Sequence, residues 1–398
     1  MAKVVVGMSG GVDSAVAAYL LKEAGHEVIG VTLRTWEADD GSVSRCCEIN
    51  DAQASAWKIG IDFHSFNCLR EFKEKVTEPF ICDYIRGLTP NPCIECNRYV
   101  KWEKLLHAAE VLGADYVATG HYAYVVKLPN GRFSVKRAKY AQKDQTYMLY
   151  KLTQEQLSKT LMPLGDYSKD EVREIARKIG LDVAEKPDSQ EICFVPDDDY
   201  AGFIIKNVPV VNEGADSICM SEKEDETAFY DRQSREKDGG ESGKPEASGV
   251  KCKAFSEGNF VDSDGNILGK HKGIIHYTVG QRRGLGLPLG YYAYVSEIRP
   301  DTNEVVVGKE DAIMHKSIIC RDVNYMGLPE LKPGDKAGLF VKIRYHHEAK
   351  HAIVEKLEGD RVRVTFDEAV RAPAPGQSSV FYDAEGCVAG GGIIEADI

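Results

Sequence analysis

The sequence has no long apolar run. A helix that spans a bilayer needs roughly 20 consecutive apolar residues, and no stretch of the 398 residues approaches that length. The start of the chain, Met1–Gly7, reaches a glycine before it could form the apolar part of a secretory signal. We therefore expect a protein with no membrane span that works in the cytoplasm.

Cysteine is also scarce. Eleven cysteines are far too few for a disulfide scaffold in a chain of this length. Since no export signal is present, we expect reduced thiols. Closely spaced cysteines in such a chain are candidates for metal binding or catalysis.

Positive charge is in short supply as well. The 50 basic residues fall below the 62 acidic ones, and the net charge of −12 argues against a general nucleic-acid binder. However, Glu213–Glu246 alone holds 11 acidic and 5 basic residues, a net of −6. Half of the acidic excess lies in this one segment, so a local basic face is compatible with the rest of the chain.

The first 180 residues alternate between strand and helix patterns. Short apolar strands between helices predict βαβ units and a parallel sheet covered on both faces. The expected strands are Lys3–Met8, Val28–Leu33, Ile61–Phe66 and Asp115–Thr119, and the expected helices are Ala15–Ala24, Ala52–Ile59, Tyr99–Leu112 and 168–180. Ser168 and Glu171 stand at capping-box spacing at the start of the last helix. We expect this α/β domain to cover residues 1–205.

The second half of the chain changes character twice. Residues 212–252 are highly charged and poor in apolar side chains, which predicts a surface insertion within a small central domain at 206–284. From about residue 290, apolar and polar residues alternate between turn signals, and this pattern predicts a small antiparallel barrel at 285–398. Its expected strands are Tyr292–Ile298, Glu304–Val307, Ala337–Tyr345, Ala352–Leu357, Arg361–Phe366 and Ser378–Tyr382.

A glycine-rich loop lies between the first strand and the first helix. Its glycines allow backbone amides to approach an anion closely, and the N-terminus of a helix favours negative charge. The loop lacks the Gly-Lys-Ser/Thr ending of a Walker A motif, and it is not Gly-x-Gly-x-x-Gly. Its Ser-Gly-Gly-x-Asp-Ser pattern resembles the PP-loop ATP pyrophosphatases, which cleave ATP between the α and β phosphates. The expected ATP-binding residues are Gly7, Met8, Ser9, Gly10, Gly11, Val12, Asp13 and Ser14, with Asp13 suited to position Mg²⁺.

Two further positions follow strands of the predicted sheet. In open α/β sheets, ligands bind at the carboxyl ends of the strands. Gly120 follows the fourth strand and Leu33 ends the second, so both are expected at the nucleotide. A purely structural role for Leu33 in the core is the alternative.

Cys93 and Cys96 form a Cys-x-x-Cys motif just before a predicted helix. Zinc would need further ligands, and no second Cys-x-x-Cys is present. A thioredoxin-like pair and a catalytic nucleophile with thiolate character from the helix dipole are the other interpretations. Cys193, within Asp188–Val195, is either a buried structural thiol or the partner thiol that sulfur transfer requires.

Together these motifs resemble the tRNA-specific 2-thiouridylase family over nearly the whole chain, apart from 212–252. The segments that carry the resemblance are 7–14, Ala118–His121, Asn91–Asn97, Lys143–Gln145, Asp188–Phe194, Gly280–Gly286 and Pro375–Gln377. The resemblance implies an N-terminal PP-loop domain, a small central domain and a C-terminal β-barrel. It also implies ATP-dependent thiolation at C2 of the wobble uridine, position 34 of tRNA.

The resemblance assigns roles residue by residue. It makes Cys96 the nucleophile and Cys193 the carrier of a persulfide, with a disulfide between them at the end of the cycle. The positions that correspond to contacts with the target base are Asn91, Pro92 and Cys93. The positions that correspond to other tRNA contacts are His121, Lys143, Asp144, Gln145, Arg344, Tyr345 and Gln377. Many relatives have Asp where Cys93 stands, so the resemblance assigns this thiol no special role.

The implied partners are tRNAs of the Glu, Gln and Lys type and a sulfur donor, either a cysteine desulfurase or a relay protein. Basic residues that alternate with apolar ones at Val341–His346 and Arg361–Val364 predict faces that contact phosphates. One rival function is a PP-loop synthetase or ligase that acts on a small molecule and needs no cysteine pair. Another is a non-enzymatic RNA-binding or redox module.

Overall fold

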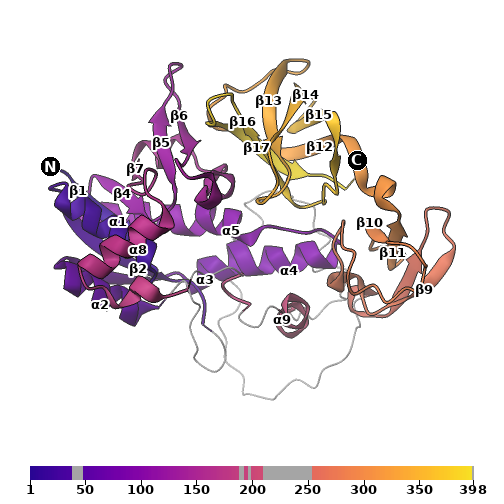
Figure 1. The fold of residues 1–398 in the computed structure, drawn as a ribbon, viewed down its shortest axis with the longest axis horizontal. Coiled ribbons are helices and arrows are strands. Elements are labelled where there is room, and N and C mark those ends of the chain that lie inside the picture. Colours follow the sequence, from indigo (N-terminus) through magenta and orange to yellow (C-terminus); the bar gives the residue numbers. More distant parts are fainter. Residues whose placement is uncertain (38–47, 188–191, 196–198, 209–252, 397–398) are drawn as a thin grey trace, which may run out of the picture.

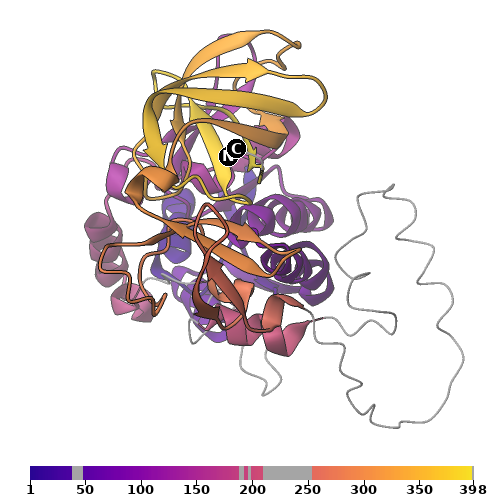
Figure 2. The same ribbon diagram turned by 90° about the vertical axis from the view of Figure 1, so that its right-hand side faces the viewer.

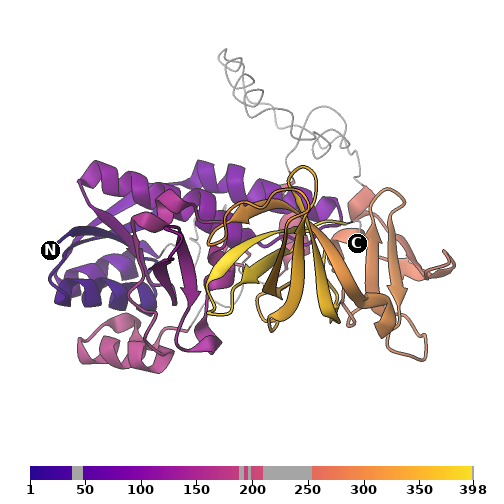
Figure 3. The ribbon, with the colours of Figure 1, turned by 90° about the horizontal axis from the view of Figure 1, so that it is seen from above.

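The computed structural model describes residues 1–37, 48–187, 192–195, 199–208 and 253–396. The insertion expected at 212–252 and most of the segment before Cys193 lie outside these residues. The described chain forms a parallel sheet with helices, a closed barrel and a separate four-stranded sheet (Figure 1). The parallel sheet and the four-stranded sheet lie at opposite ends of the molecule, with the barrel between them, as the view from above also shows (Figure 3). No helix within the described ranges is both long and apolar enough to cross a membrane.

The parallel sheet has the order β3-β2-β1-β4-β7. Its strands are β1 (Lys3–Gly7), β2 (Glu27–Arg34), β3 (Asp62–Asn67), β4 (Tyr116–Thr119) and β7 (Thr160–Leu161). Apolar residues on β1 alternate between the two faces. Val4 and Val6 pack into a cluster with α1 and α2, whereas Val5 packs into a second cluster with Leu105 of α6. The expected parallel sheet, buried on both faces, is confirmed.

The helices have the bounds α1 (Val12–Glu23), α2 (Ile49–Ile59), α3 (Leu69–Phe72), α4 (Glu78–Ile85), α5 (Pro92–Glu95), α6 (Trp102–Leu112), α7 (Gln154–Ser158), α8 (Lys169–Lys178) and α9 (Tyr200–Asn207). The expected capping box of α8 is present, because Ser168 and Glu171 each accept a backbone N–H of the other. Segments Lys73–Thr77 and Cys96–Lys101 are π-helical and join α3 to α4 and α5 to α6.

A four-stranded sheet with the order β10-β11-β8-β9 forms the end of the molecule opposite the parallel sheet (Figures 1 and 2). Its strands are β8 (Gly258–Val261), β9 (Ile267–His271), β10 (Tyr294–Arg299) and β11 (Glu304–Gly308). The strands expected at Tyr292–Ile298 and Glu304–Val307 therefore exist, but their assignment to the barrel was wrong. β11 pairs in parallel with β8, with Glu304 opposite Asn259. A pairing between residues so far apart in the sequence leaves no trace in local alternation.

The closed barrel has the order β12-β15-β14-β13-β16-β17. Its strands are β12 (Met314–Tyr325), β13 (Lys336–Lys342), β14 (Lys350–Lys356), β15 (Arg361–Arg371), β16 (Ser378–Tyr382) and β17 (Val388–Ile394). β12 and β17 were not expected. β17 contains three consecutive glycines, which usually weaken a strand. Here they permit close contact, since a Cβ on Gly391 would lie 2.5 Å from the Tyr150 ring.

Hydrogen bonds connect the barrel to two parts of the N-terminal half, a hairpin and the segment at Tyr150. The hairpin consists of β5 (Ala123–Lys127) and β6 (Phe133–Arg137). Arg132 on the hairpin loop donates to the carbonyl oxygen of Met326 (2.8 Å), Ser134 donates to that of Val388 (2.8 Å), and Asn324 donates to that of Tyr150 (2.6 Å). Tyr147 and Tyr382 are fully buried in the same cluster as β1. One core therefore runs from the parallel sheet into the barrel.

Candidate active site

The Gly7–Ser14 loop connects β1 to α1 at the carboxyl edge of the sheet. The backbone N–H of Ser9 donates to the Ser14 hydroxyl oxygen (3.2 Å), and this hydroxyl donates to the carbonyl oxygen of Gly11 (3.1 Å). Gly10 has φ +77°, and a Cβ there would meet the Glu48 carbonyl oxygen at 2.7 Å. No side chain caps α1 at Gly11. The first amides of α1 therefore receive no side-chain cap, which is compatible with an anion at this helix N-terminus.

Gly120 follows β4 and lies directly against this loop. A Cβ at this position would come within 2.6 Å of the Ser14 backbone nitrogen. Any larger residue would push β4 away from the start of α1. Gly120 and Leu33 both line the cavity described below, which is compatible with their expected place at a nucleotide.

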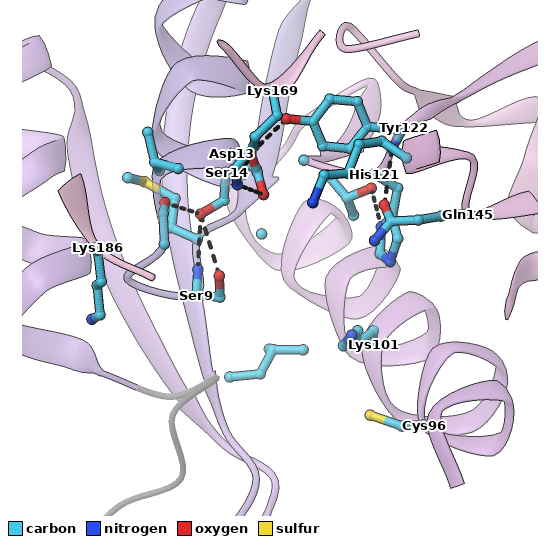
Figure 4. A pocket seen from close by; sticks show the side chains of 18 of the residues that line it. Ser9, Asp13, Ser14, Cys96, Lys101, His121, Tyr122, Gln145, Lys169 and Lys186 are labelled. Carbon is cyan, nitrogen blue, oxygen red and sulfur yellow. Dashed lines mark hydrogen bonds and ion pairs between the residues drawn. The ribbon is translucent and has the colours of Figure 1, made fainter. Parts of the chain in front are cut away.

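The carboxylate of Asp13 is bound by two residues distant in the sequence. Lys169, at the start of α8, donates to both carboxylate oxygens at 2.8 Å. The Tyr122 hydroxyl donates to one of them at 2.7 Å. The Lys169 side chain is only 11% exposed. The loop thus has a buried cation beside it (Figure 4).

A second lysine reaches the loop from the segment after α8. The Lys186 ammonium donates to the Gly10 carbonyl oxygen (3.2 Å) and to Asp51 (2.7 Å), and it also pairs with Glu48. Burial lowers the pKa of Lys186 below its usual value. Two lysines therefore flank the Gly7–Ser14 loop, and sequence reasoning missed both. Lys169 is the first residue of the capped helix predicted at 168–180. Its place at the start of this helix is the only feature of the sequence that could have drawn attention to it.

A cavity of about 760 Å³ opens in front of the loop. Ser9 and Ser14 contribute from the loop, and Cys96 and Lys101 contribute from the helical segment before α6 (Figure 4). Tyr345, which follows β13 of the barrel, completes the wall. The cavity is thus built by both the parallel-sheet domain and the barrel, and it brings the expected ATP loop and the expected nucleophile to one space.

Cys96 is 6% exposed at the start of the π-helical segment. Cys93 is exposed one turn earlier. The carboxamide oxygen of Asn91 accepts the backbone N–H of Cys93 (3.2 Å) and caps α5, and Pro92 occupies the first helical position. Asn91 and Pro92 therefore start the helix that carries Cys96.

Cys193 is half-buried and does not line the cavity. Its neighbour Phe194 is fixed among Phe72, Phe80 and Trp36, with ring centroids 5.3–6.2 Å apart. Pro187, six residues before Cys193, does line the cavity, and six residues of extended chain reach at most about 22 Å. Residues 188–191 between them lie outside the described chain. Among the described cysteines none forms a disulfide, so the expected Cys96–Cys193 bond is not shown.

Asn91, Pro92 and Cys93, expected at the target base, do not line the cavity. The seven other residues expected to contact tRNA divide into two groups. Lys143, Gln145, His121 and Tyr345 line the cavity. The remaining three do not. The side chain of each of these three residues makes hydrogen bonds within the protein.

Asp144 is 7% exposed and accepts from the Thr146 hydroxyl at 2.8 Å. Arg344 donates to the carbonyl oxygens of Val279 (2.8 Å) and Ala372 (3.0 Å). Gln377 donates to the carbonyl oxygen of Thr89 (2.8 Å), two residues before Asn91. All three therefore stabilise the walls around the cavity.

The basic face expected at Arg361–Val364 is present on β15, but the alternation expected as far as His346 stops where β13 ends at Lys342. Arg361 and Arg363 project outward and pair with Glu395 (2.7 Å) and Glu355 (3.6 Å). Lys342 lies near the Tyr147 and Tyr345 rings, at 6.0 and 5.8 Å. It also lines a neighbouring cavity of about 810 Å³ that shares Tyr345 and His346 with the first. Lys342 therefore places one positive charge of the barrel beside the cavities.

His121 is neutral in this setting. Burial lowers its pKa to about 3, with a smaller contribution from the Lys101 charge. Its Nδ1 lies 2.8 Å from the Thr119 hydroxyl oxygen, and its ring packs on Trp102. A neutral imidazole can donate one hydrogen bond and accept another, which suits contact with a nucleobase edge.

The parallel sheet, the Ser-Gly-Gly-x-Asp-Ser loop and the adjacent thiol define a class of α/β nucleotide-activating domains. The family comparisons agree in all three parts of the chain. Residues 2–197 match the family described as tRNA methyl transferase HUP domain, 251–309 match the tRNA methyl transferase PRC-barrel domain, and 315–394 match the aminomethyltransferase beta-barrel domain.

Curated relatives cover the full length. The chain is 50% identical to the tRNA-specific 2-thiouridylase MnmA of Lachnoclostridium phytofermentans, over 99% of this chain and 100% of the relative. It is 44% identical to the protein of the same name from Clostridioides difficile, over 100% and 99% of the two chains. The chain belongs to the tRNA-specific 2-thiouridylase family. A solved 4-thiouridine synthetase–RNA complex with bound ATP is a distant neighbour, with 20% identity, a TM-score of 0.32 and coverage of 48% of this chain and 45% of that one.

Proposed function

We propose that the protein is a tRNA-uridine 2-sulfurtransferase that makes 2-thiouridine at the wobble position, with AMP and pyrophosphate as the other products. One observation supports this above all others. A single cavity contains both the phosphate loop and Cys96, and the chain resembles 2-thiouridylases from end to end. A ligase for small molecules would need the loop but not the thiol.

The residues present fit a nucleotide. The loop offers Ser9, Ser14 and the uncapped amides of α1 to the phosphates. Lys169 and Lys186 supply positive charge at its two sides. Among the described residues no cluster of acidic, His or Cys side chains could hold a metal alone. Proteins usually bind Mg²⁺ through one or two carboxylates together with substrate phosphates, and Asp13 in the loop is the carboxylate we propose to help position it.

The first step activates the base. The uridine must leave the anticodon stack to enter the cavity, at a cost of a few kcal/mol. Its C2 oxygen attacks the α-phosphorus of ATP, and pyrophosphate leaves toward the loop. Within the cavity, His121 and Tyr345 are the residues we propose to hold the base. Asn91, Pro92 and Cys93, at the start of the helix that leads to Cys96, are the further base contacts we propose. This step turns a poor leaving group into AMP.

The second step transfers sulfur. The terminal sulfur of a persulfide on Cys193 attacks C2 and displaces AMP. The Cys96 thiolate then attacks the Cys193 sulfur, which releases the thiocarbonyl and leaves a Cys96–Cys193 disulfide. The sulfane sulfur gains two electrons and the two thiols lose two, so an external thiol reductant must reopen the disulfide. Cys193 must approach the cavity for this step, and the 188–191 segment joins it to the cavity wall at Pro187.

We further propose that a cysteine desulfurase or a sulfur relay protein loads Cys193, and that the substrates are tRNAs of the Glu, Gln and Lys type. A reducing cytoplasm suits both the thiol chemistry and tRNA maturation. We therefore propose the cytoplasm as the site of action.

The test is incubation with ATP, Mg²⁺, a persulfide-generating sulfur source and unmodified tRNA, followed by mass analysis of the nucleosides. We expect 2-thiouridine with the wild type and none with Cys96→Ala or Cys193→Ala. Cys82→Ala, on α4 outside the cavity wall, is the matched control and should retain activity. Formation of 2-thiouridine by Cys193→Ser would contradict the persulfide role of Cys193. Absence of 2-thiouridine with the wild type would favour a PP-loop enzyme of another kind.

A further inference from the structure

A loop at residues 280–293, here called the Arg-Tyr loop, lies in an unusual charge environment. From Gly265 to Ser296 the sequence has 32 residues without a single Asp or Glu, and four of them are Lys or Arg. The whole chain carries 12 more acidic than basic residues. The absence of carboxylates leaves the positive charges of this stretch uncompensated along the chain.

The loop exposes two tyrosines together with cations. Tyr292 is 74% exposed and Tyr291 is 45% exposed. The Arg282 guanidinium lies over the Tyr292 ring at 4.9 Å, and the Lys309 ammonium lies over the Tyr291 ring at 5.6 Å. Large exposed aromatic side chains are uncommon on a surface that only faces water. Here each of the two tyrosine rings lies against a cation, and the four side chains form one patch.

The conformation of the loop is fixed by Gln281. Its side-chain oxygen accepts the backbone N–H of Thr278 (3.1 Å), and its side-chain nitrogen donates to the carbonyl oxygen of Arg283 (3.1 Å). Its own carbonyl oxygen accepts the backbone N–H of Val295 (2.9 Å). Arg282 and Arg283 therefore lie on a turn whose backbone is already held by hydrogen bonds. The patch loses little backbone freedom when it binds a partner.

The position of the loop relates it to the cavity. It leads into β10, and Lys309 follows β11, so the patch lies on the four-stranded sheet, at the opposite end of the molecule from the parallel sheet (Figures 1 and 3). The start of the loop is tied to the barrel by Arg344, which donates to the Val279 carbonyl oxygen. Arg344 is the neighbour of Tyr345 in the cavity wall. The Arg-Tyr loop contributes no residue to the cavity wall, but it is anchored to the barrel beside that wall.

We propose that the Arg-Tyr loop is a second RNA-contact surface, which binds the tRNA at a distance from the anticodon. The proposal rests on the tRNA substrate of the proposed function. Cations contact phosphates, and aromatic or guanidinium planes stack on unpaired bases. A folded tRNA extends far from its anticodon loop, so an RNA with one base in the cavity has other parts available for this surface. The loop thereby selects a whole tRNA over a short RNA hairpin.

The experiment compares two RNAs with two double variants. One RNA is an unmodified full-length tRNA and the other is its isolated anticodon stem-loop. Arg282→Gln/Arg283→Gln removes the charges of the loop. Arg177→Gln/Lys178→Gln removes an equally exposed basic pair from the end of α8 and is the matched control. Tyr292→Leu tests stacking, and Tyr292→Phe should preserve it.

For the loop variant we expect the Kd for full-length tRNA to rise about tenfold, and the slope of log Kd against log salt to fall by about 1 to 2. The Kd for the stem-loop should stay unchanged, as should both values for the control variant. Thermal unfolding of each variant shows whether it is folded. Equal losses with both RNAs, or none with either, would overturn the proposal.

Two other outcomes separate this inference from the function on which it rests. If the wild type itself fails to bind tRNA, the proposed function fails. If the loop variant binds both RNAs normally but loses thiolation only with a protein sulfur donor, and not with a low-molecular-weight persulfide, the surface binds that donor and the inference is wrong.

Discussion

Two side chains hold the carboxylate of Asp13, and neither is close to it in the sequence. The motif itself indicated Asp13, because a short loop with fixed spacing follows β1. Lys169 and Tyr122 reach it only because α8 and β4 pack beside α1. Local patterns therefore located the loop but not the cations around it. Contacts between elements are set by tertiary packing, which the spacing of residues along the chain does not encode.

Replacement of Lys169 by Met should weaken ATP binding about 10- to 100-fold, since a hydrogen bond to a charged group contributes roughly 1.5–3 kcal/mol. The variant loses a cation beside the phosphates and leaves the Asp13 charge uncompensated. Calorimetric titration with ATP and Mg²⁺ measures the effect. Lys178→Met at the other end of α8 is the control. An unchanged affinity for ATP would mean that Lys169 serves Asp13 alone.

His121 makes stability depend on pH. Its pKa in the folded chain, about 3, lies below the unfolded value of 6.5. Between these values the unfolded state binds a proton that the folded state does not, so stability falls as the pH falls below 6.5 and this loss levels off near pH 3. At pH 5 the His121 contribution is about 1–2 kcal/mol. In His121→Gln, the loss of unfolding free energy between pH 7 and pH 5, measured with urea, should be smaller by this amount.

Among the helices and strands, the sequence predicted best those whose pattern lies entirely within the element itself. The helix at 168–180 was predicted from its capping box, and β1, β2 and β4 from short apolar runs. β17 was missed because glycines are unfavourable in strands. Here the absence of a side chain at Gly391 makes room for the Tyr150 ring. The π-helical segment at Cys96 was also missed, since no residue in it departs from a helical pattern.

A half-buried ion cluster joins the helical segment that carries Cys96 to the barrel. The Lys151 side chain is 7% exposed and donates to Glu95 and to Asp322 of β12, both at 2.8 Å. Burial works against its charge, but Tyr150, Glu95 and Asp322 together raise its pKa well above the usual value. Glu95 directly precedes Cys96. The cluster therefore fixes the Cys96 turn relative to the barrel.

Replacement of Lys151 by Met should lower the free energy of unfolding by about 1–3 kcal/mol, less than for a fully buried pair because the two carboxylates can still reach water. Urea unfolding measures this. Lys159→Met removes a 53% exposed partner of Glu155 and should change stability by less than about 0.5 kcal/mol. Addition of Glu95→Gln and Asp322→Asn to Lys151→Met should restore part of the loss, and a further decrease would contradict the electrostatic explanation.

At the scale of the whole molecule, an acidic protein must bind an acidic substrate. Of the net charge of −12, the segment Glu213–Glu246 accounts for −6, which leaves −6 for all other residues. Three stretches lack Asp and Glu altogether: 116–143 with six Lys or Arg, 265–296 with four and 336–347 with three. The first stretch supplies Lys143, which lines the first cavity together with Gln145. The third stretch supplies Lys342, which lines the second cavity. Residues of the two stretches therefore meet around the two cavities. Charge is thus segregated, and the net value hides it.

This segregation predicts tRNA binding that depends strongly on salt. With three or four phosphates contacted, log Kd should rise with log salt at a slope of about 3, so affinity should fall about 10- to 100-fold between 50 and 200 mM salt. ATP binding should change far less, because its contacts are enclosed in the cavity. Filter binding of tRNA over this range, with ATP titrations under the same conditions, tests both statements. A tRNA affinity that is flat across the series would show that the acid-free stretches do not face phosphates, and recognition would then rest on the base in the cavity alone.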